Sequence, residues 1–118
     1  MNRVLRLAAV PIAIALLFAS CSSNGTTADP STKVTAVAAF YPLAFAAQRI
    51  GGDRVTVRDL TPNGAEPHDL EPTADQVDAI QDASLVIVMG RGFQPSVEKA
   101  ASKRSKTTVE VLDALNVT

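Results

Sequence analysis

The only histidine of the chain, His68, lies in a stretch, Thr61–Glu71, that is rich in groups able to bind a cation. Two prolines and a glycine exclude a regular helix or a central strand there, and the turn signature at 62–64 predicts a shaped loop. An imidazole flanked by carboxylates can attract a divalent cation. The flanking carboxylates are Glu66, Asp69 and Glu71. An ordinary surface histidine is the alternative, because structural zinc sites need about four ligands and usually contain several His or Cys residues.

Other motifs point to no competing chemistry. The turn Gly90-Arg91-Gly92 begins like a dinucleotide-binding fingerprint, but Pro95 stands at the third glycine position, so a strand-ending turn is the simpler interpretation. A serine hydrolase would need a Gly-x-Ser-x-Gly elbow, which the sequence lacks. No basic stripe with stacking aromatics is present, so nucleic acid is not an expected partner.

Residues 1–20 have the pattern of an export signal. Arg3 and Arg6 form a positive region, and the uncharged run Leu7–Ala19 is shorter than the roughly 20 apolar residues of a membrane-spanning helix. Two small residues then stand directly before Cys21. This arrangement resembles a bacterial lipoprotein signal, in which Cys21 becomes the lipidated first residue of the mature chain. We therefore expect an exported protein that is lipid-anchored to the cell membrane and faces the periplasm or the extracellular side.

Residues 21–32 predict a flexible tether, because Ser, Thr, Gly, Asn and Pro dominate the segment. Such a polar setting favours lipidation of Cys21 over burial of its thiol. The sequence has no second cysteine, so an intramolecular disulfide is excluded. Without residues 1–20 the chain keeps nine basic residues against twelve acidic ones, a net charge near −3, since the signal holds Arg3 and Arg6.

Beyond the tether, apolar runs of strand length alternate with stretches of helical spacing. We predict strands over 34–40, 55–60, 85–89 and 108–112, and helices over 42–50, 73–83 and 95–102. This alternation indicates an α/β fold with a parallel sheet of about four strands and flanking helices. Ligands of such sheets bind beyond the carboxyl ends of the strands, and the loop with His68 lies on that edge.

Several segments stand in one order along the chain: Ala39-Phe40-Tyr41-Pro42-Leu43, Ile50-Gly51-Gly52-Asp53, Leu60-Thr61-Pro62 with Gly64–Glu71, and Asp82-Ala83 before Leu85-Val86-Ile87. Taken together, they resemble the amino-terminal lobe of the zinc and manganese receptors of ABC importers. The resemblance covers about Lys33 to Leu115 and is most specific at Glu66-Pro67-His68.

That resemblance implies two α/β lobes joined by a long helix, with one metal ion between them. His68 falls on the first metal-ligand histidine, and the other ligands are expected in segments after Thr118. Residues 33–118 would then form a partial receptor lobe, with an apolar face exposed where the linking helix and second lobe pack. Phe40, Tyr41 and Pro42 are expected as core and corner residues beneath the site.

The leading hypothesis is a non-enzymatic receptor that captures Zn²⁺ or Mn²⁺ outside the cytoplasmic membrane and delivers it to an ABC permease. The sequence leaves the choice between the two metals open, because it depends on the further ligands. An exported adhesin or structural lipoprotein without metal is the second hypothesis, and a metal-dependent hydrolase is the third.

Overall fold

The computed structural model describes residues 32–117 of the 118-residue chain. The predicted signal segment, Cys21 and all of the predicted tether except Thr32 lie outside the described residues. Within the described part, no helix combines the length and the hydrophobicity needed to cross a membrane.

Four parallel strands form one sheet, as the alternation of elements predicts. They are β1 (Val34–Ala38), β2 (Val55–Asp59), β3 (Leu85–Val88) and β4 (Thr107–Glu110), in the spatial order β2-β1-β3-β4. Each neighbouring pair is parallel, with Val34 opposite Val55 and Leu85 opposite Thr107. The predicted α/β fold class is therefore confirmed.

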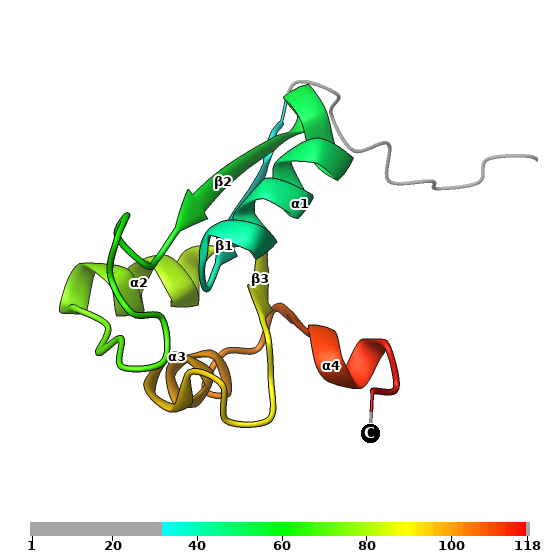
Figure 1. The fold of residues 1–118 in the computed structure, drawn as a ribbon. Coiled ribbons are helices and arrows are strands. Elements are labelled where there is room, and N and C mark those ends of the chain that lie inside the picture. The colour runs from blue at the N-terminus through cyan, green and yellow to red at the C-terminus, as the bar shows by residue number, and fades with distance from the viewer. Residues whose placement is uncertain (1–31, 118) are drawn as a thin grey trace, which may run out of the picture.

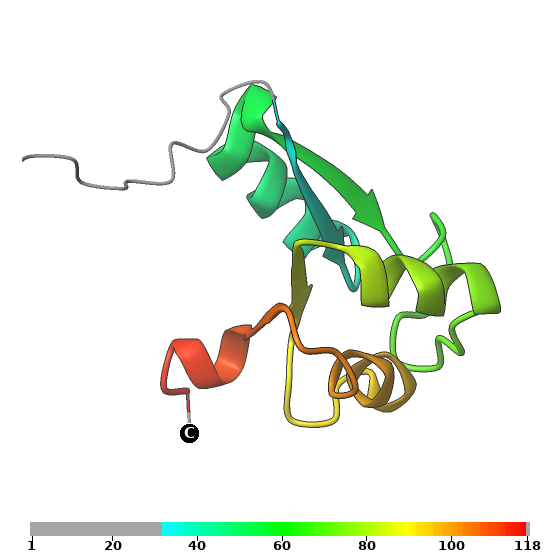
Figure 2. The ribbon, with the colours of Figure 1, turned by 180° about the vertical axis from the view of Figure 1, so that it is seen from behind.

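Three helices connect the strands. They are α1 (Tyr41–Gly51), α2 (Ala74–Asp82) and α3 (Pro95–Ala101). Figures 1 and 2 show α1 on one face of the sheet and both α2 and α3 on the other. This division follows from right-handed crossovers, because the chain moves from β1 to β2 in one direction and from β2 through β3 to β4 in the other.

The main core lies between the sheet and the helices α2 and α3. Val86 and Val88 of β3 and Val97 of α3 are each at most 1% exposed, and Ile80 of α2 is fully buried. The alternation along β3 leaves Leu85 and Ile87 only partly buried, and they line the opposite face beside α1. The sheet is thus well covered on one face and less so on the other.

Local signals explain where the first two helices begin and end. Pro42 lies in the first turn of α1, and the helix stops before Gly52, whose φ is 53°. Thr73 and Gln76 form the predicted capping box at the start of α2.

Two short elements were not predicted. A 3-10 turn, η1 (Gly52–Arg54), precedes β2, and a short helix, α4 (Val111–Ala114), follows β4. The prediction of a strand up to Leu112 was therefore wrong at its end. A five-residue apolar-rich run such as 108–112 is compatible with a strand and with the start of a helix. In the structure the Leu115 N–H donates to the carbonyl of Val111, which is a helical hydrogen bond.

Candidate metal site

His68 lies on the carboxyl-terminal edge of the sheet, in the irregular segment between β2 and α2. This edge is a topological switch point, because β1 and β3 are neighbours and their following loops lead to helices on opposite faces. The turn predicted at 62–64 is present, with Ala65 N–H donating to the carbonyl of Pro62 at 3.0 Å and Gly64 at φ 82°. The predicted location of His68 is confirmed.

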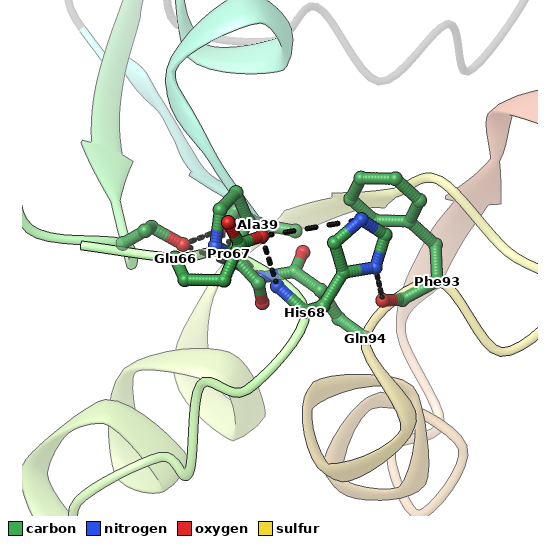
Figure 3. A network of polar contacts seen from close by, with 7 residues as sticks. Ala39, Glu66, Pro67, His68, Phe93 and Gln94 are labelled. Atoms are coloured by element: carbon green, nitrogen blue, oxygen red, sulfur yellow. Dashed lines mark hydrogen bonds and ion pairs between the residues drawn. The ribbon is translucent and has the colours of Figure 1, made fainter. Parts of the chain in front are cut away.

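The imidazole of His68 is held by the loop that follows β3. Its Nδ1 lies 2.9 Å from the carbonyl oxygen of Phe93, and the two ring centroids are 4.0 Å apart. The Phe93 ring in turn stacks on Phe40 at 5.1 Å. Figure 3 shows the imidazole beside the Phe93 ring, with a dashed line from Nδ1 of His68 to the carbonyl oxygen of Phe93.

This contact fixes the tautomer of the neutral imidazole. A carbonyl oxygen only accepts hydrogen bonds, so Nδ1 of His68 carries the hydrogen and Nε2 keeps its lone pair. A second ring nitrogen that donates to a backbone carbonyl is the usual support of a metal-binding histidine. The His68 side chain is 56% exposed, so a cation in solution can reach it.

Of the three carboxylates near His68 in sequence, the structure brings Glu66 to the imidazole. One oxygen of Glu66 accepts the backbone N–H of His68 at 3.3 Å and lies 4.0 Å from Nε2. Glu71 instead accepts a hydrogen bond from the Ser96 hydroxyl at 2.6 Å, and Asp69 is exposed. Among residues 32–117, no group of three or more His, Cys, Asp or Glu residues could hold a metal ion. The described residues thus offer one imidazole donor, with a single carboxylate close to it.

The floor of the site is partly as predicted. Phe40 is 8% exposed and belongs to the core, which confirms its predicted place. Tyr41 is 63% exposed, so it is not a core residue, and it stands at the corner between β1 and α1. It begins α1, and its ring lies 6.1 Å from that of Phe45 on the same helix.

Sequence reasoning missed both residues that follow the β3 turn, Phe93 and Gln94. Gln94 is 1% exposed, and its amide reaches the His68 loop. One signal could have pointed to it, since Gln is an unusual residue immediately before a proline that starts a helix, where Ser, Thr, Asp or Asn is preferred.

The carboxyl end of β2 carries a partly buried acid, Asp59, beside the loop. Burial raises the pKa of the Asp59 carboxyl, and the hydrogen bond that it accepts from the Thr61 N–H at 3.1 Å opposes part of that rise. The Thr61 hydroxyl donates to the carbonyl of Ala39 at 2.7 Å and so ties the start of the His68 loop to the end of β1.

The family model described as zinc-uptake complex component A, periplasmic, matches residues 36–118. The chain belongs to this family. The manganese-binding lipoprotein MntA of Halalkalibacterium halodurans is 30% identical over 101 residues, which cover 85% of this chain and 34% of that protein. The high-affinity zinc uptake system protein ZnuA of Bacillus subtilis is 35% identical over 91 residues, covering 72% and 28%.

Solved structures of metal-dependent and metal-binding proteins share the fold. The metal-dependent lipoprotein YcdH from Bacillus subtilis superimposes with a TM-score of 0.60 at 32% identity, covering 65% of this chain and 30% of that one. A Mn-bound periplasmic metal-binding protein from Candidatus Liberibacter asiaticus gives a TM-score of 0.62 at 26% identity, covering 71% and 32%. The chain spans about a third of the length of the curated relatives that it matches.

Proposed function

We propose that this chain supplies the amino-terminal, His68-bearing part of a receptor that captures Zn²⁺ or Mn²⁺ outside the cytoplasmic membrane. The observation that carries the proposal is the bond from His68 Nδ1 to the Phe93 carbonyl. This bond leaves the lone pair of Nε2 available to a metal ion at the switch-point edge. Family membership supports the proposal, and so do the names of two relatives, a manganese-binding lipoprotein and a zinc uptake protein.

The metal is cargo in this proposal, and His68 is one ligand among several. A Zn²⁺ or Mn²⁺ site needs further donors, and the described residues offer no cluster that would supply them. The captured ion would pass to the membrane subunit of an ABC permease, so the chain acts as a receptor without catalysis.

Substitution His68→Ala in the intact receptor tests the ligand role. We expect the affinity for Zn²⁺ to fall at least about a hundredfold, measured by competition with a chromophoric chelator, because one of about four fixed donors is lost. Glu71→Gln is the matched control in the same loop, since Glu71 contacts Ser96, and it should leave the affinity unchanged. Equal affinities of wild type and His68→Ala would remove His68 from the site, and native protein purified without metal would favour the adhesin or structural-module hypothesis.

We further propose that Cys21 is acylated and that the chain is anchored to the outer side of the membrane through it. The sequence pattern of residues 1–21 supports this, and more than one acyl chain makes a stable anchor. Mass spectrometry of membrane-extracted protein should find the amino-terminal residue to be an acylated Cys21, and an unmodified thiol there would contradict the proposal.

A further inference from the structure

Gln94 is the most deeply buried polar residue of the part of the chain that the structure describes. It is 1% exposed, and the second such residue, Thr61, is 8% exposed. The two are in contact, since the Gln94 amide nitrogen lies 3.3 Å from the Thr61 hydroxyl oxygen. Both therefore belong to one buried polar network beneath the His68 loop (Figure 3).

The amide nitrogen of Gln94 connects the loops that follow β1 and β2. It donates to the carbonyl of Pro67 at 2.8 Å and lies within 3.4 Å of the carbonyl of Ala39. Pro67 directly precedes His68, and Ala39 directly follows β1. Gln94 follows β3, so this side chain at the start of α3 reaches across the switch point to the loops that follow β1 and β2.

Donors and acceptors in this network match in one orientation of the amide. The Thr61 hydroxyl gives its hydrogen to the Ala39 carbonyl, so its oxygen can accept one hydrogen of Gln94, while Pro67 accepts the other. The reversed amide would place its oxygen against two carbonyl oxygens. In the present orientation Oε1 of Gln94 is buried without a partner, which carries an energetic penalty that an apolar residue would avoid.

Gln94 also gives up a capping role to make these contacts. It occupies the N-cap of α3 but makes no side-chain cap bond there. Glu98 instead holds the turn before the helix, accepting the backbone N–H groups of Gln94 at 3.2 Å and Gly92 at 2.8 Å. A buried, partly unsatisfied residue that breaks a local preference marks a site where function and local stability compete.

We propose that Gln94 is a positioning residue that holds His68 in its metal-binding orientation, an inference that rests on the proposed function. The neighbouring residues Phe93 and Gln94 contact the neighbouring residues Pro67 and His68. The side-chain amide of Gln94 donates to the carbonyl of Pro67, and the carbonyl of Phe93 accepts Nδ1–H of His68. Because both contacts come from the start of α3, loss of the first frees the loop to move away from the second.

The test uses the tautomer of the metal-free protein, read by ¹⁵N NMR of the imidazole. His68 is the only histidine, so its signals need no assignment. Wild type should populate mainly the form with the hydrogen on Nδ1, and Gln94→Leu should shift the population toward the form with it on Nε2. Gln81→Leu is the control, because it removes a similar amide bond, to the Ala100 carbonyl at 2.9 Å, away from His68. An unchanged tautomer in folded Gln94→Leu would overturn the proposal.

A second measurement connects position to binding. Gln94→Leu in the intact receptor should weaken Zn²⁺ binding by about tenfold to a hundredfold, as for other groups that orient a ligand, and Gln81→Leu should not. If Gln94→Leu does not fold, Gln94→Met replaces it, since Met is unbranched and fills irregular space. If Gln94→Leu alters the tautomer but His68→Ala leaves the Zn²⁺ affinity unchanged, the proposed function is wrong and the positioning role of Gln94 stands. If Gln94→Leu leaves the tautomer unchanged but His68→Ala weakens Zn²⁺ binding, the positioning role is wrong and the proposed function stands.

Discussion

The hydrogen-bond partner of His68 Nδ1 affects the charge of the proposed metal site in its metal-free form. Phe93 supplies a neutral carbonyl to Nδ1, whereas many metal-binding histidines use a carboxylate there. A carbonyl fixes the tautomer without adding negative charge. In the proposed metal site, the negative charge that balances a divalent cation would therefore come from the direct ligands. Glu66, 4.0 Å from Nε2, is the one carboxylate of residues 32–117 that lies this close to the imidazole nitrogens.

Asp59 is a residue of this edge whose ionisation bears on stability. Burial raises the pKa of its carboxyl in the folded state, and the Thr61 N–H bond opposes that rise only in part. A raised folded-state pKa means that the charged form is disfavoured by folding. The stabilising contribution is therefore fully present below the unfolded-state pKa and is lost as the pH rises through the folded-state pKa.

Substitution Asp59→Asn should accordingly stabilise the protein at neutral pH. Asparagine keeps an oxygen for the Thr61 N–H and carries no charge. Because Asp59 is partly exposed, solvent screens the effect, and we expect a rise in Tm of about 1–3 °C at pH 7 that disappears near pH 3. Thermal unfolding followed by circular dichroism measures both values, with the exposed Asp53→Asn as control. A lower Tm at pH 7 would show that the charged hydrogen bond outweighs the cost of burial.

At the scale of elements, Arg104 connects the end of α2 to the start of β4. Its guanidinium donates to the carbonyls of Ile80, at 2.9 Å from Nε, and of Ala83 and Thr107. Arg104 follows α3 in the sequence, but its side chain turns to carbonyls at the end of α2, in the preceding βαβ unit.

Substitution Arg104→Ala should lower the free energy of unfolding by about 2–3 kcal/mol, since several carbonyls lose a charged donor. The neighbouring Lys103→Ala is the control, because Lys103 is exposed, and it should change stability by less than about 0.5 kcal/mol. Urea denaturation measures both. Equal stabilities of the two variants would show that water replaces the guanidinium at these carbonyls.

Elements were predictable where the signal is local. The capping box of Thr73 and Gln76 needs only four consecutive residues, and it is present as predicted. By contrast, the Ile80 and Ala83 carbonyls that Arg104 contacts lie 24 and 21 residues away in the sequence. The same holds at the site. The loop and edge of His68 follow from turn residues and strand order, whereas Phe93 lies 25 residues away and the amide of Gln94 acts on a carbonyl 27 residues away.

At the scale of the whole molecule, the strand order leaves one face of the sheet incompletely covered. Helix α1 follows β1 and packs on β1 and β2, while α2 and α3 lie on the other face, so the α1 side of β3 has no helix from these crossovers (Figures 1 and 2). A hollow of about 400 Å³ is present there, lined mainly by apolar residues that include Ala47, Leu85 and Ile87. The described residues thus leave an apolar face exposed, as predicted, and the packing of a linking helix and a second lobe against it stays a prediction.

Ile50 stands at the rim of this hollow and gives a direct test of how exposed the face is in solution. Its side chain is 83% exposed, so Ile50→Lys should change the free energy of unfolding by less than about 0.5 kcal/mol. The same change removes apolar surface from a contiguous patch, so binding of a hydrophobic fluorescent dye and concentration-dependent association should both decrease. Ile80→Lys is the contrast, because Ile80 is fully buried and an unpaired ammonium there should cost more than about 4 kcal/mol and unfold the chain. If Ile50→Lys destabilised the protein as Ile80→Lys does, Ile50 would have to be packed rather than exposed, and the open face of the sheet would be closed in solution.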